Sequence, residues 1–296
     1  MPKNREFDII VYGATGFTGR LVAEHLLAAY GVGKGVNWAM AGRSQSKLEE
    51  VRAELGGPDT LPLVVADADN AGSLKALAES TSVIITTVGP YQLYGSALVA
   101  ACAAAGTDYV DLCGEPAWMA EMIGAHEAAA KASGARIVFS CGFDSIPFDL
   151  GVWFLQQEAI KRSGKPAARV RGRIRDMLGT FSGGTLASMR ATMGAMAQNP
   201  AVGAVLANPF ALTPGFTGPA QPADNAVIYD EVAKSWVSPF VMATINTKNV
   251  HRSNFLLGHQ YGQDFAYDEM SLNGDGPEGE AKAKGGGGAA FAAGGK

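Results

Sequence analysis

The most constraining feature of the sequence is a glycine-rich turn that follows a short apolar segment near the start of the chain. Ile9–Tyr12 is apolar, and glycine then recurs at Gly13, Gly16 and Gly19. Between a strand and a helix, the first glycine permits a tight turn and the second lets the backbone approach a pyrophosphate. The third lets the helix pack closely on the strand. The free N–H groups that begin the helix would meet the phosphate charge, so the turn predicts a dinucleotide site.

A repeated alternation of strands and helices places this turn in a fold. From residue 7 to about 140, short apolar runs alternate with helical patterns, which indicates strand-helix units around a parallel sheet. The predicted fold class is α/β, a Rossmann doubly wound parallel sheet with a second, smaller α+β domain. The predicted strands are Phe7–Tyr12, Asn37–Ala41, Leu61–Ala66, Val83–Thr87, Tyr109–Leu112 and Arg136–Ser140.

Capping residues mark the ends of the intervening helices. Ser46 and Asn70 are predicted N-caps, because their side-chain oxygens can accept from the free N–H groups of a first turn. Gly106 and Gly134 lie where helices should end.

The alternation of strands and helices changes after about residue 143, which predicts a second domain. The predicted domains are residues 1–148, 149–272 and a low-complexity tail, 273–296, which we expect to be disordered or irregular. Within the second domain we expect helices at Asp144–Lys161, Ser182–Met196 and Pro239–Leu257, an exposed antiparallel strand at Ala168–Met177, a Pro/Gly-rich loop at Asn199–Asp224 and a strand near Asp264–Met270.

Composition excludes several functional classes. The 296 residues are 47% hydrophobic and 18% charged, with a formal net charge of −4, which fits a globular protein and argues against nucleic-acid binding. The three cysteines and four histidines show no metal-ligand spacing, so no metal is expected. We expect a cytoplasmic protein without a secretion signal, because the N-terminus runs directly into a strand pattern. Peripheral membrane or lipid contact and a homodimer stay open.

The ends of the predicted strands favour NADP(H) over NAD. Where NAD-specific sites usually place an acid after the second strand, this chain has Arg43, which can pair with a 2′-phosphate, and Ser44, a second donor. Asp67 could bind the adenine amino group or cap a helix, and the Gly-Pro turn after the fourth strand can approach the nicotinamide ribose. The predicted cofactor-binding residues are Gly13, Ala14, Thr15, Gly16, Phe17, Thr18, Arg43, Ser44, Asp67, Val88, Gly89 and Pro90.

Candidate catalytic residues follow the fourth and fifth strands, at the sheet edge where open α/β proteins bind ligands. They are Tyr91, Asp111, Cys113 and Glu115, with Asp144 as a further candidate for proton transfer or substrate orientation. For each of them a capping or structural hydrogen bond is the alternative, and the cysteines could equally serve as small buried side chains.

Two features of the second domain are also chemically suggestive. Arg169, Arg171, Arg173 and Arg175 lie on one face of a predicted strand, either as a solvated surface or as a dock for an acidic carrier protein or phosphopantetheine. Ser182–Thr185 could hold an enolate or carboxylate through backbone donors at a helix start.

Together, the motifs Gly13–Gly19, Ala41–Arg43, Val88–Tyr91, Cys113–Glu115 and Cys141–Asp149 resemble the saccharopine dehydrogenase-like family, and within it the trans-acting enoyl reductase branch. Similarity in Ser182–Thr185 and the segment 239–254 extends the resemblance to about residue 272. It implies NADPH-dependent reduction of a carbon-carbon double bond in a polyketide or fatty-acyl thioester for lipid biosynthesis, with the substrate held by a carrier protein or polyketide synthase. Backbone N–H groups near Gly183 would then stabilise an enolate, and Tyr91 or water would supply the proton.

Two other hypotheses stay open: a catalytically silent, NADP-bound scaffold associated with lipid, and a saccharopine-type amino-acid dehydrogenase. Arg43 argues against the second, which predicts a preference for NAD. Relatives in the family usually continue with further strands, whereas this chain becomes rich in Gly, Ala and Lys after Leu272, so we expect a shortened or divergent form.

Overall fold

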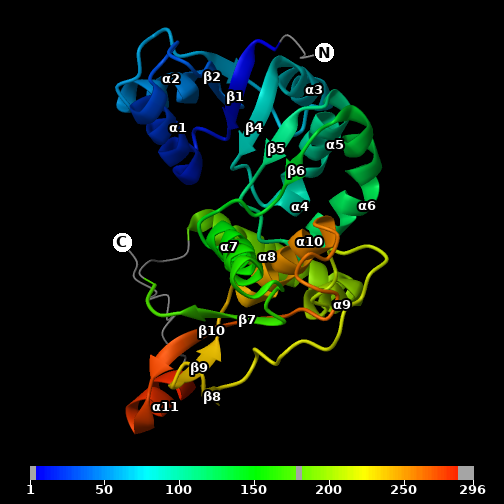
Figure 1. Ribbon diagram of the computed structural model, residues 1–296. Helices are drawn as coiled ribbons and strands as arrows, with labels where there is room; N and C mark the ends of the chain where they lie inside the picture. The colour runs from blue at the N-terminus through cyan, green and yellow to red at the C-terminus, as the bar shows by residue number, and fades with distance from the viewer. Residues whose placement is uncertain (1–4, 178–181, 286–296) are drawn as a thin grey trace. The chain divides into compact units, whose positions relative to one another are not determined.

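The computed structural model describes residues 5–177 and 182–285 (Figure 1). They form two compact units. Unit 1 contains the chain up to Gly142 together with Ala187–Ala191, and unit 2 contains Phe143–Leu186 and the chain from Thr192 onward. The division after Gly142 lies slightly upstream of the domain boundary at residue 148 that we predicted.

Unit 1 is built on a parallel sheet of six strands in the order β3-β2-β1-β4-β5-β6. The Rossmann-type α/β fold is therefore confirmed, with the switch point between the neighbouring strands β1 and β4, where Ile10 pairs with Ile84. The strands are β1 (Phe7–Tyr12), β2 (Trp38–Gly42), β3 (Leu63–Val65), β4 (Thr81–Thr86), β5 (Asp108–Val110) and β6 (Ile137–Val138).

Helices cover both faces of this sheet, with α1 and α2 on one face and α3, α5 and α6 on the other (Figure 1). Their bounds are α1 (Phe17–Tyr30), α2 (Gln45–Glu54), α3 (Ala71–Ser80), the single turn α4 (Tyr91–Tyr94), α5 (Ser96–Ala105) and α6 (Pro116–Ser133). The core under α1 and α2 includes Trp38, Met40, Leu48 and Leu61, each at most 1% exposed. Burying each such side chain contributes about 1.5–3 kcal/mol.

The helix ends mostly follow the predicted caps. Asn70 caps α3 by accepting from the N–H of Ser73, and Gly106 and Gly134 end α5 and α6 in the left-handed conformation. The predicted cap at Ser46 is wrong, because α2 begins earlier and the Ser44 side chain accepts from the N–H of Lys47. Serine occurs at both positions, and only the hydroxyl that precedes the first turn can reach its free N–H groups.

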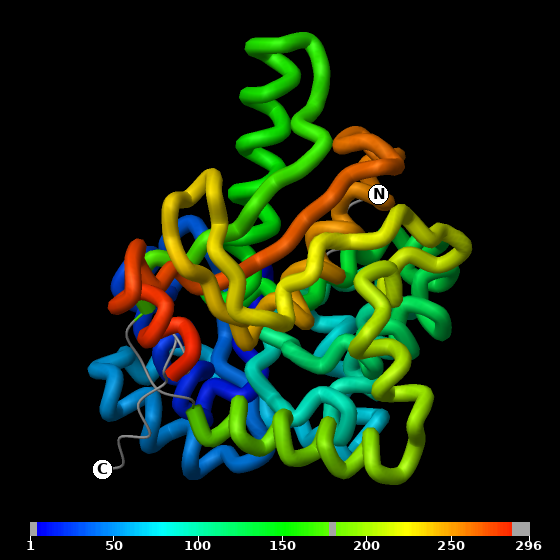
Figure 2. The backbone as a smooth tube through the Cα atoms, turned by 90° about the horizontal axis from the view of Figure 1, so that it is seen from below, coloured from blue at the N-terminus to red at the C-terminus, as the bar shows by residue number. Residues whose placement is uncertain are grey.

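Unit 2 contains a mixed sheet of four strands in the order β7-β10-β9-β8. The strands are β7 (Arg169–Ile174), β8 (Ile228–Asp230), β9 (Ser235–Pro239) and β10 (Ala266–Gly274). The prediction that β7 is antiparallel is wrong, because it pairs in parallel with β10. Figure 2 shows these two segments, which are far apart in the sequence, side by side. Alternating polarity reports which face of a strand is buried and carries no information on the direction of its partner.

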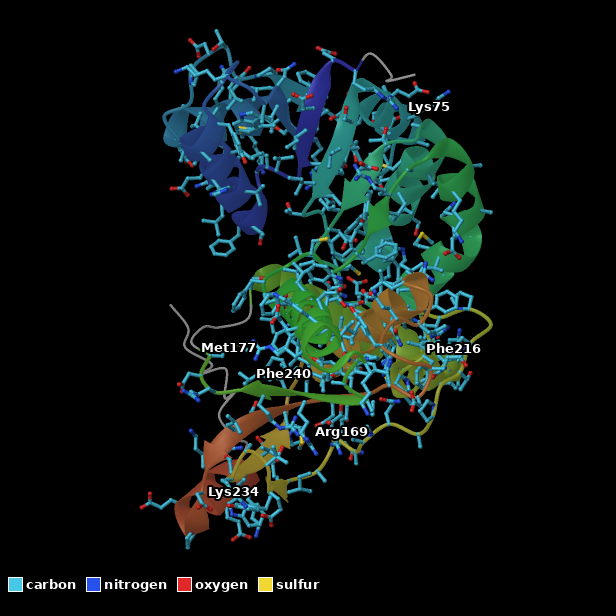
Figure 3. The ribbon with its side chains drawn as sticks, in the orientation of Figure 1. Lys75, Arg169, Met177, Phe216, Lys234 and Phe240 are labelled. Atoms are coloured by element: carbon cyan, nitrogen blue, oxygen red, sulfur yellow. The ribbon has the colours of Figure 1, made fainter. Side chains whose placement is uncertain are left out.

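Five helices complete unit 2: α7 (Ile146–Ser163), α8 (Gly183–Gln198, partly in unit 1), α9 (Pro200–Ala207), α10 (Ala243–Leu256) and α11 (Gly276–Lys284). Phe240 is buried with Met242 and Ala243, and Phe148 and Met177 pack against them (Figure 3). The positive charge of the arginines on β7 is partly neutralised, since Arg173 forms ion pairs with Asp230 and Asp268 at 2.8 and 2.7 Å.

Three segments differ from the prediction. The expected loop at Asn199–Asp224 contains α9, which begins with a capping Asn199 and a proline in its first turn. The helix expected from Pro239 begins at Ala243, since residues up to Pro239 belong to β9. The expected irregular tail begins with the end of β10 and with α11, whose first N–H groups are capped by Asp275. The rest of that tail, 286–296, lies outside the described residues.

Candidate functional site

The glycine-rich turn is as tight as its sequence predicts. Gly13 has φ +92°, a conformation that side chains with a Cβ rarely adopt. A Cβ on Gly19 would lie 2.1 Å from the carbonyl oxygen of Gly13, which is impossible without moving the helix. A Cβ on Gly16 would meet the same oxygen at 3.4 Å, an ordinary contact. Gly13 and Gly19 are therefore required by the fold, whereas Gly16 leaves open space on its outer side.

The first turn of α1 is suited to bind an anion. Gly16 is its N-cap and has no side chain that could accept a hydrogen bond from the following N–H groups. There is also no acidic residue in the first turn. These N–H groups carry the positive end of the helix dipole, so a diphosphate placed there would gain both hydrogen bonds and a favourable field.

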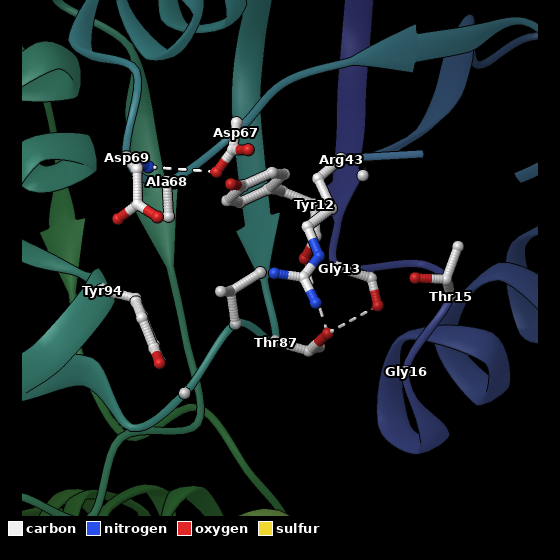
Figure 4. Close-up of a pocket in the computed structure, with 13 residues that line it drawn as sticks. Tyr12, Gly13, Thr15, Gly16, Arg43, Asp67, Ala68, Asp69, Thr87 and Tyr94 are labelled. Atoms are coloured by element: carbon white, nitrogen blue, oxygen red, sulfur yellow. Dashed lines mark hydrogen bonds between the residues drawn. The ribbon is translucent and has the colours of Figure 1, made fainter. Parts of the chain in front are cut away.

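A pocket of about 300 Å³ lies beside this turn, at the carboxyl ends of β1 to β4 (Figure 4). It is formed entirely within unit 1. Its lining residues are Tyr12, Gly13, Thr15, Gly16, Gly42, Arg43, Asp67, Ala68, Asp69, Thr87, Val88, Gly89 and Tyr94.

Most of the predicted cofactor-binding residues lie in this pocket, but five do not. Ala14 is fully buried in the core, and Phe17 is 74% exposed. Thr18 and Pro90 do not line the pocket, and Ser44 uses its hydroxyl as the cap of α2. Four of the five are next to a lining residue in the sequence and Thr18 is two residues from Gly16, but the side chains of all five lie outside the lining of the pocket.

The charges in the pocket are arranged around Arg43. Its side chain is exposed and forms no ion pair or hydrogen bond with any residue in 5–177 or 182–285. Asp67 accepts a hydrogen bond from the N–H of Asp69 at 3.1 Å. Burial raises the pKa of Tyr12 to about 12. The negative charges of Asp67 and Asp69 also raise it, and the positive charge of Arg43 lowers it. Arg43 therefore lies within electrostatic reach of the same site and is available to a ligand phosphate.

Six lining residues had not been assigned to the site from the sequence. Gly42 belongs to the motif Ala41–Arg43 and Thr87 ends the predicted strand Val83–Thr87, so strand position alone could have identified both. Tyr12 could have been found in the same way, as the last residue of β1. Nothing local distinguishes Ala68, Asp69 and Tyr94, which reach the pocket because the loop after β3 and the turn α4 fold against it.

The four candidate catalytic side chains are all buried, with Tyr91 4%, Asp111 3%, Cys113 1% and Glu115 2% exposed, and none of them lines the pocket. The Tyr91 hydroxyl donates to the carbonyl of Thr86 at 3.2 Å, and burial raises its pKa well above the usual range. Burial also raises the pKa of the Cys113 thiol, so that it is not a reactive thiolate at neutral pH.

Asp111 connects the ends of β5 and β6. It accepts hydrogen bonds from the N–H groups of Cys113 and Ser140, at 2.9 and 2.8 Å, and from the hydroxyl of Tyr109 at 2.8 Å. Burial raises its pKa to about 7 against these hydrogen bonds, which favour the charged form.

Glu115 connects the loop after β5 to the turn α4. Its carboxylate accepts from the N–H groups of Tyr91 and Gln92, both at 2.9 Å, and from the hydroxyl of Ser188 at 2.7 Å. It therefore holds in place the segment that carries Val88 and Gly89 into the pocket. Whether these side chains act in catalysis stays a prediction.

Comparison with known proteins shows which proteins this chain is similar to. Residues 9–138 match the family model of the saccharopine dehydrogenase NADP-binding domain, so unit 1 is an NADP-binding domain. A trans-acting enoyl reductase of Mycobacterium leprae is 41% identical over 92% of this chain and 67% of its own length. A Mycobacterium tuberculosis protein named for the same activity is 42% identical over 90% of this chain and 65% of its own length. The chain spans about two thirds of the length of these relatives.

Among solved structures, apo saccharopine dehydrogenase (L-Glu forming) from Saccharomyces cerevisiae matches 57% of this chain and 34% of its own, at 15% identity and a TM-score of 0.44. None of the helices within residues 5–177 and 182–285 combines the length and the hydrophobicity of a membrane-spanning segment. In the same part of the chain, no group of three or more His, Cys, Asp or Glu residues is placed to hold a metal ion.

Proposed function

Because the chain belongs to the saccharopine dehydrogenase-like family, in its branch of trans-acting enoyl reductases, we propose that it is an NADPH-dependent enoyl reductase. The observation that carries this proposal is one pocket in which an uncapped helix start and an unpaired Arg43 lie together, in a chain about 40% identical to proteins named for that activity.

The residues present fit the cofactor. The N–H groups at the start of α1 bind the diphosphate, and Arg43 pairs with the 2′-phosphate. Asp67 and Asp69 offer carboxylate oxygens to the exocyclic amino group of adenine. When bound, the cofactor supplies a hydride for the substrate.

The proposed substrate is the double bond of an enoyl thioester, carried in the cytoplasm by a carrier protein of a polyketide synthase-type partner. Reduction of such a bond places negative charge on the thioester oxygen and requires a proton at the α-carbon. Since the hydroxyl of Tyr91 is buried and engaged with Thr86, water is the proposed proton source.

The buried carboxylates of Asp111 and Glu115 hold the loops at the carboxyl edge of the sheet. They position the segments after β4, β5 and β6 by accepting hydrogen bonds from N–H groups of those segments. This is a positioning role, which corresponds to the structural hydrogen bonds that the sequence left open as the alternative to proton transfer or substrate orientation.

The test is turnover. Purified protein is mixed with NADPH and either an enoyl N-acetylcysteamine thioester or the same enoyl group on a carrier domain, and the loss of NADPH absorbance is followed together with the mass of the product. We expect a product heavier by two hydrogens and faster turnover of the carrier-bound substrate. Tight binding of NADP⁺ with no turnover of either substrate would contradict the proposal.

That result would support a second candidate, a cofactor-bound protein that is catalytically silent. One observation favours it: none of the four side chains predicted to be catalytic reaches the pocket.

A further inference from the structure

Two tyrosines on the single turn α4 have opposite environments. Tyr91 is 4% exposed, lies with its ring 5.7 Å from that of Trp118, and donates its hydroxyl to Thr86. Tyr94 is 42% exposed and lines the pocket (Figure 4). Its hydroxyl forms no hydrogen bond with a residue in the described part of the chain. One ring therefore belongs to the core, and the other faces the site.

The backbone that carries Tyr94 is held firmly although its ring is half exposed. Glu115 accepts hydrogen bonds from the N–H groups of Tyr91 and Gln92 at the start of the turn. At its end, the N–H of Gly95 donates to the carbonyl of Tyr91 at 2.7 Å, and a Cβ on Gly95 would lie 2.7 Å from the ring of Trp118. The turn is thus fixed on both sides, and the ring is presented to the pocket without a large loss of backbone entropy on binding.

Topology indicates which half of a dinucleotide this pocket holds. All its lining residues follow or end β1, β2, β3 and β4, or belong to α4, and none comes from the loops after β5 and β6. With the strand order β3-β2-β1-β4, a diphosphate on α1 directs the adenosine half toward β2 and β3. In Figure 4, Tyr94 lies on the same side of the view as Ala68 and Asp69, away from Thr15.

Adenine requires a flat apolar surface for its ring and acceptors for its amino group. The pocket supplies the acceptors as Asp67 and Asp69. Two tyrosines line the same pocket, but Tyr12 is only 3% exposed, whereas Tyr94 is 42% exposed and can present the face of its ring to a base. We propose that Tyr94 forms one wall of the adenine subsite and stacks on the base of NADP⁺. This inference rests on the cofactor assignment in the proposed function and does not depend on the substrate.

The experiment compares Tyr94→Ala and Tyr94→Phe with the unmodified protein by calorimetric titration with NADP⁺ and with adenosine 2′,5′-bisphosphate, which lacks the nicotinamide half. If the ring stacks on adenine, Tyr94→Ala weakens both ligands by the same factor, roughly ten- to hundredfold, and Tyr94→Phe binds nearly as tightly as the unmodified protein. Leu93→Ala is the matched control, because Leu93 is 61% exposed on the same turn and does not line the pocket.

A second measurement uses the fluorescent 1,N⁶-ethenoadenine analogue of NADP⁺, whose etheno bridge removes the amino hydrogens offered to Asp67 and Asp69, so that it reports on stacking alone. Stacking on Tyr94 predicts a change of its fluorescence on binding to the unmodified protein and to Tyr94→Phe, and a much smaller change with Tyr94→Ala at saturation. Circular dichroism checks that each variant is folded, and the phenylalanine variant keeps the test valid should the alanine variant unfold.

Unchanged binding of adenosine 2′,5′-bisphosphate to Tyr94→Ala overturns the proposal, whether or not NADP⁺ binding falls, since the ring would then lie outside the adenine subsite. Failure of the unmodified protein to bind either ligand overturns both this inference and the cofactor assignment. Absence of turnover with intact, Tyr94-dependent binding contradicts only the enoyl reductase proposal.

Discussion

Arg43 projects from the end of β2 into a pocket that also contains Asp67 and Asp69. A 2′-phosphate beside it gains a charge-assisted pair, whereas the free hydroxyl of NAD⁺ gains little from a guanidinium. We expect Arg43→Ala to weaken NADP⁺ roughly ten- to hundredfold and to leave NAD⁺ binding almost unchanged. Calorimetry with both dinucleotides measures the two effects.

Lys47→Ala is the control for this substitution, since Lys47 is an exposed cation on α2 that does not line the pocket. Lys47→Ala should leave the affinities for NADP⁺ and NAD⁺ almost unchanged, because salt screens an exposed charge outside the pocket. Equal losses for NADP⁺ and NAD⁺ in Arg43→Ala would show that Arg43 does not recognise the additional phosphate.

Glu269, on β10, makes the stability of unit 2 dependent on pH. It is fully buried, accepts from Tyr267 at 2.7 Å and from Asn246 at 2.9 Å, and burial raises its pKa from 4.5 to about 7. Between pH 4.5 and about 7 the carboxyl is ionised in the unfolded chain and neutral in the folded one. Its contribution to the free energy of unfolding is therefore complete below about pH 4.5, falls as the pH rises and is lost above about 7.

Replacing this carboxyl removes the titration. We expect the difference in unfolding free energy between Glu269→Gln and the unmodified protein to shift in favour of the variant by about 2–3 kcal/mol from pH 5 to pH 8. Urea denaturation at both values, with tryptophan fluorescence as the signal, measures it. Glu278→Gln, an exposed acid on α11, is the control. A difference that does not vary with pH would mean that Glu269 is ionised in the folded protein throughout.

The site could be predicted from the sequence where chemistry follows directly from neighbouring residues. The turn Gly13–Gly19 and Arg43 combine a local motif with a strand end, and both were found. Tyr94 and Asp69 were not, because their positions depend on how α4 and the loop after β3 fold across the sheet edge. For Tyr91, the sequence indicated the correct turn, but it could not show which of the two tyrosine rings on that turn, Tyr91 or Tyr94, faces the core.

At the scale of elements, the turn α4 depends on a carboxylate from another loop. Two of its N–H groups donate to the carboxylate of Glu115, and truncating this side chain would remove both hydrogen bonds. Each such loss costs roughly 1–3 kcal/mol, so we expect Glu115→Ala to lower the unfolding free energy of unit 1 by about 2–4 kcal/mol and to weaken NADP⁺ binding. Denaturant titration and calorimetry measure the two effects.

Glu121→Ala tests whether the effect is specific. Glu121 is exposed on α6, so its removal should change stability by no more than about 0.5 kcal/mol. A stable Glu115→Ala protein with normal NADP⁺ affinity and abolished turnover would instead favour the proton-transfer role suggested by the sequence.

The two sheets differ in how far their elements could be predicted. In unit 1 each strand is a short apolar run beside a helix, and local signals such as Asn70 and Gly106 mark the boundaries. In unit 2, β7 pairs with β10 from near the end of the described chain, and the short hairpin of β8 and β9 carries little apolar periodicity. Partners this distant in sequence leave no signal in either strand alone.

At the scale of the whole molecule, the cofactor pocket is formed by unit 1 alone. A ligand present at 100 times its Kd stabilises the folded form by about 2.7 kcal/mol, which is a factor of roughly 100 in the equilibrium population of the unfolded form. We therefore expect saturating NADP⁺ to slow hydrogen exchange in β1 and β4 by up to that factor and to leave the amides of β7 and β10 nearly unchanged. Mass spectrometry of peptides from each strand measures both effects. Arg43→Ala at the same NADP⁺ concentration should show correspondingly less protection, because the effect depends on the ligand's affinity. Equal protection of β10 in the unmodified protein would mean that the two units unfold together, and that binding in one unit stabilises the whole chain.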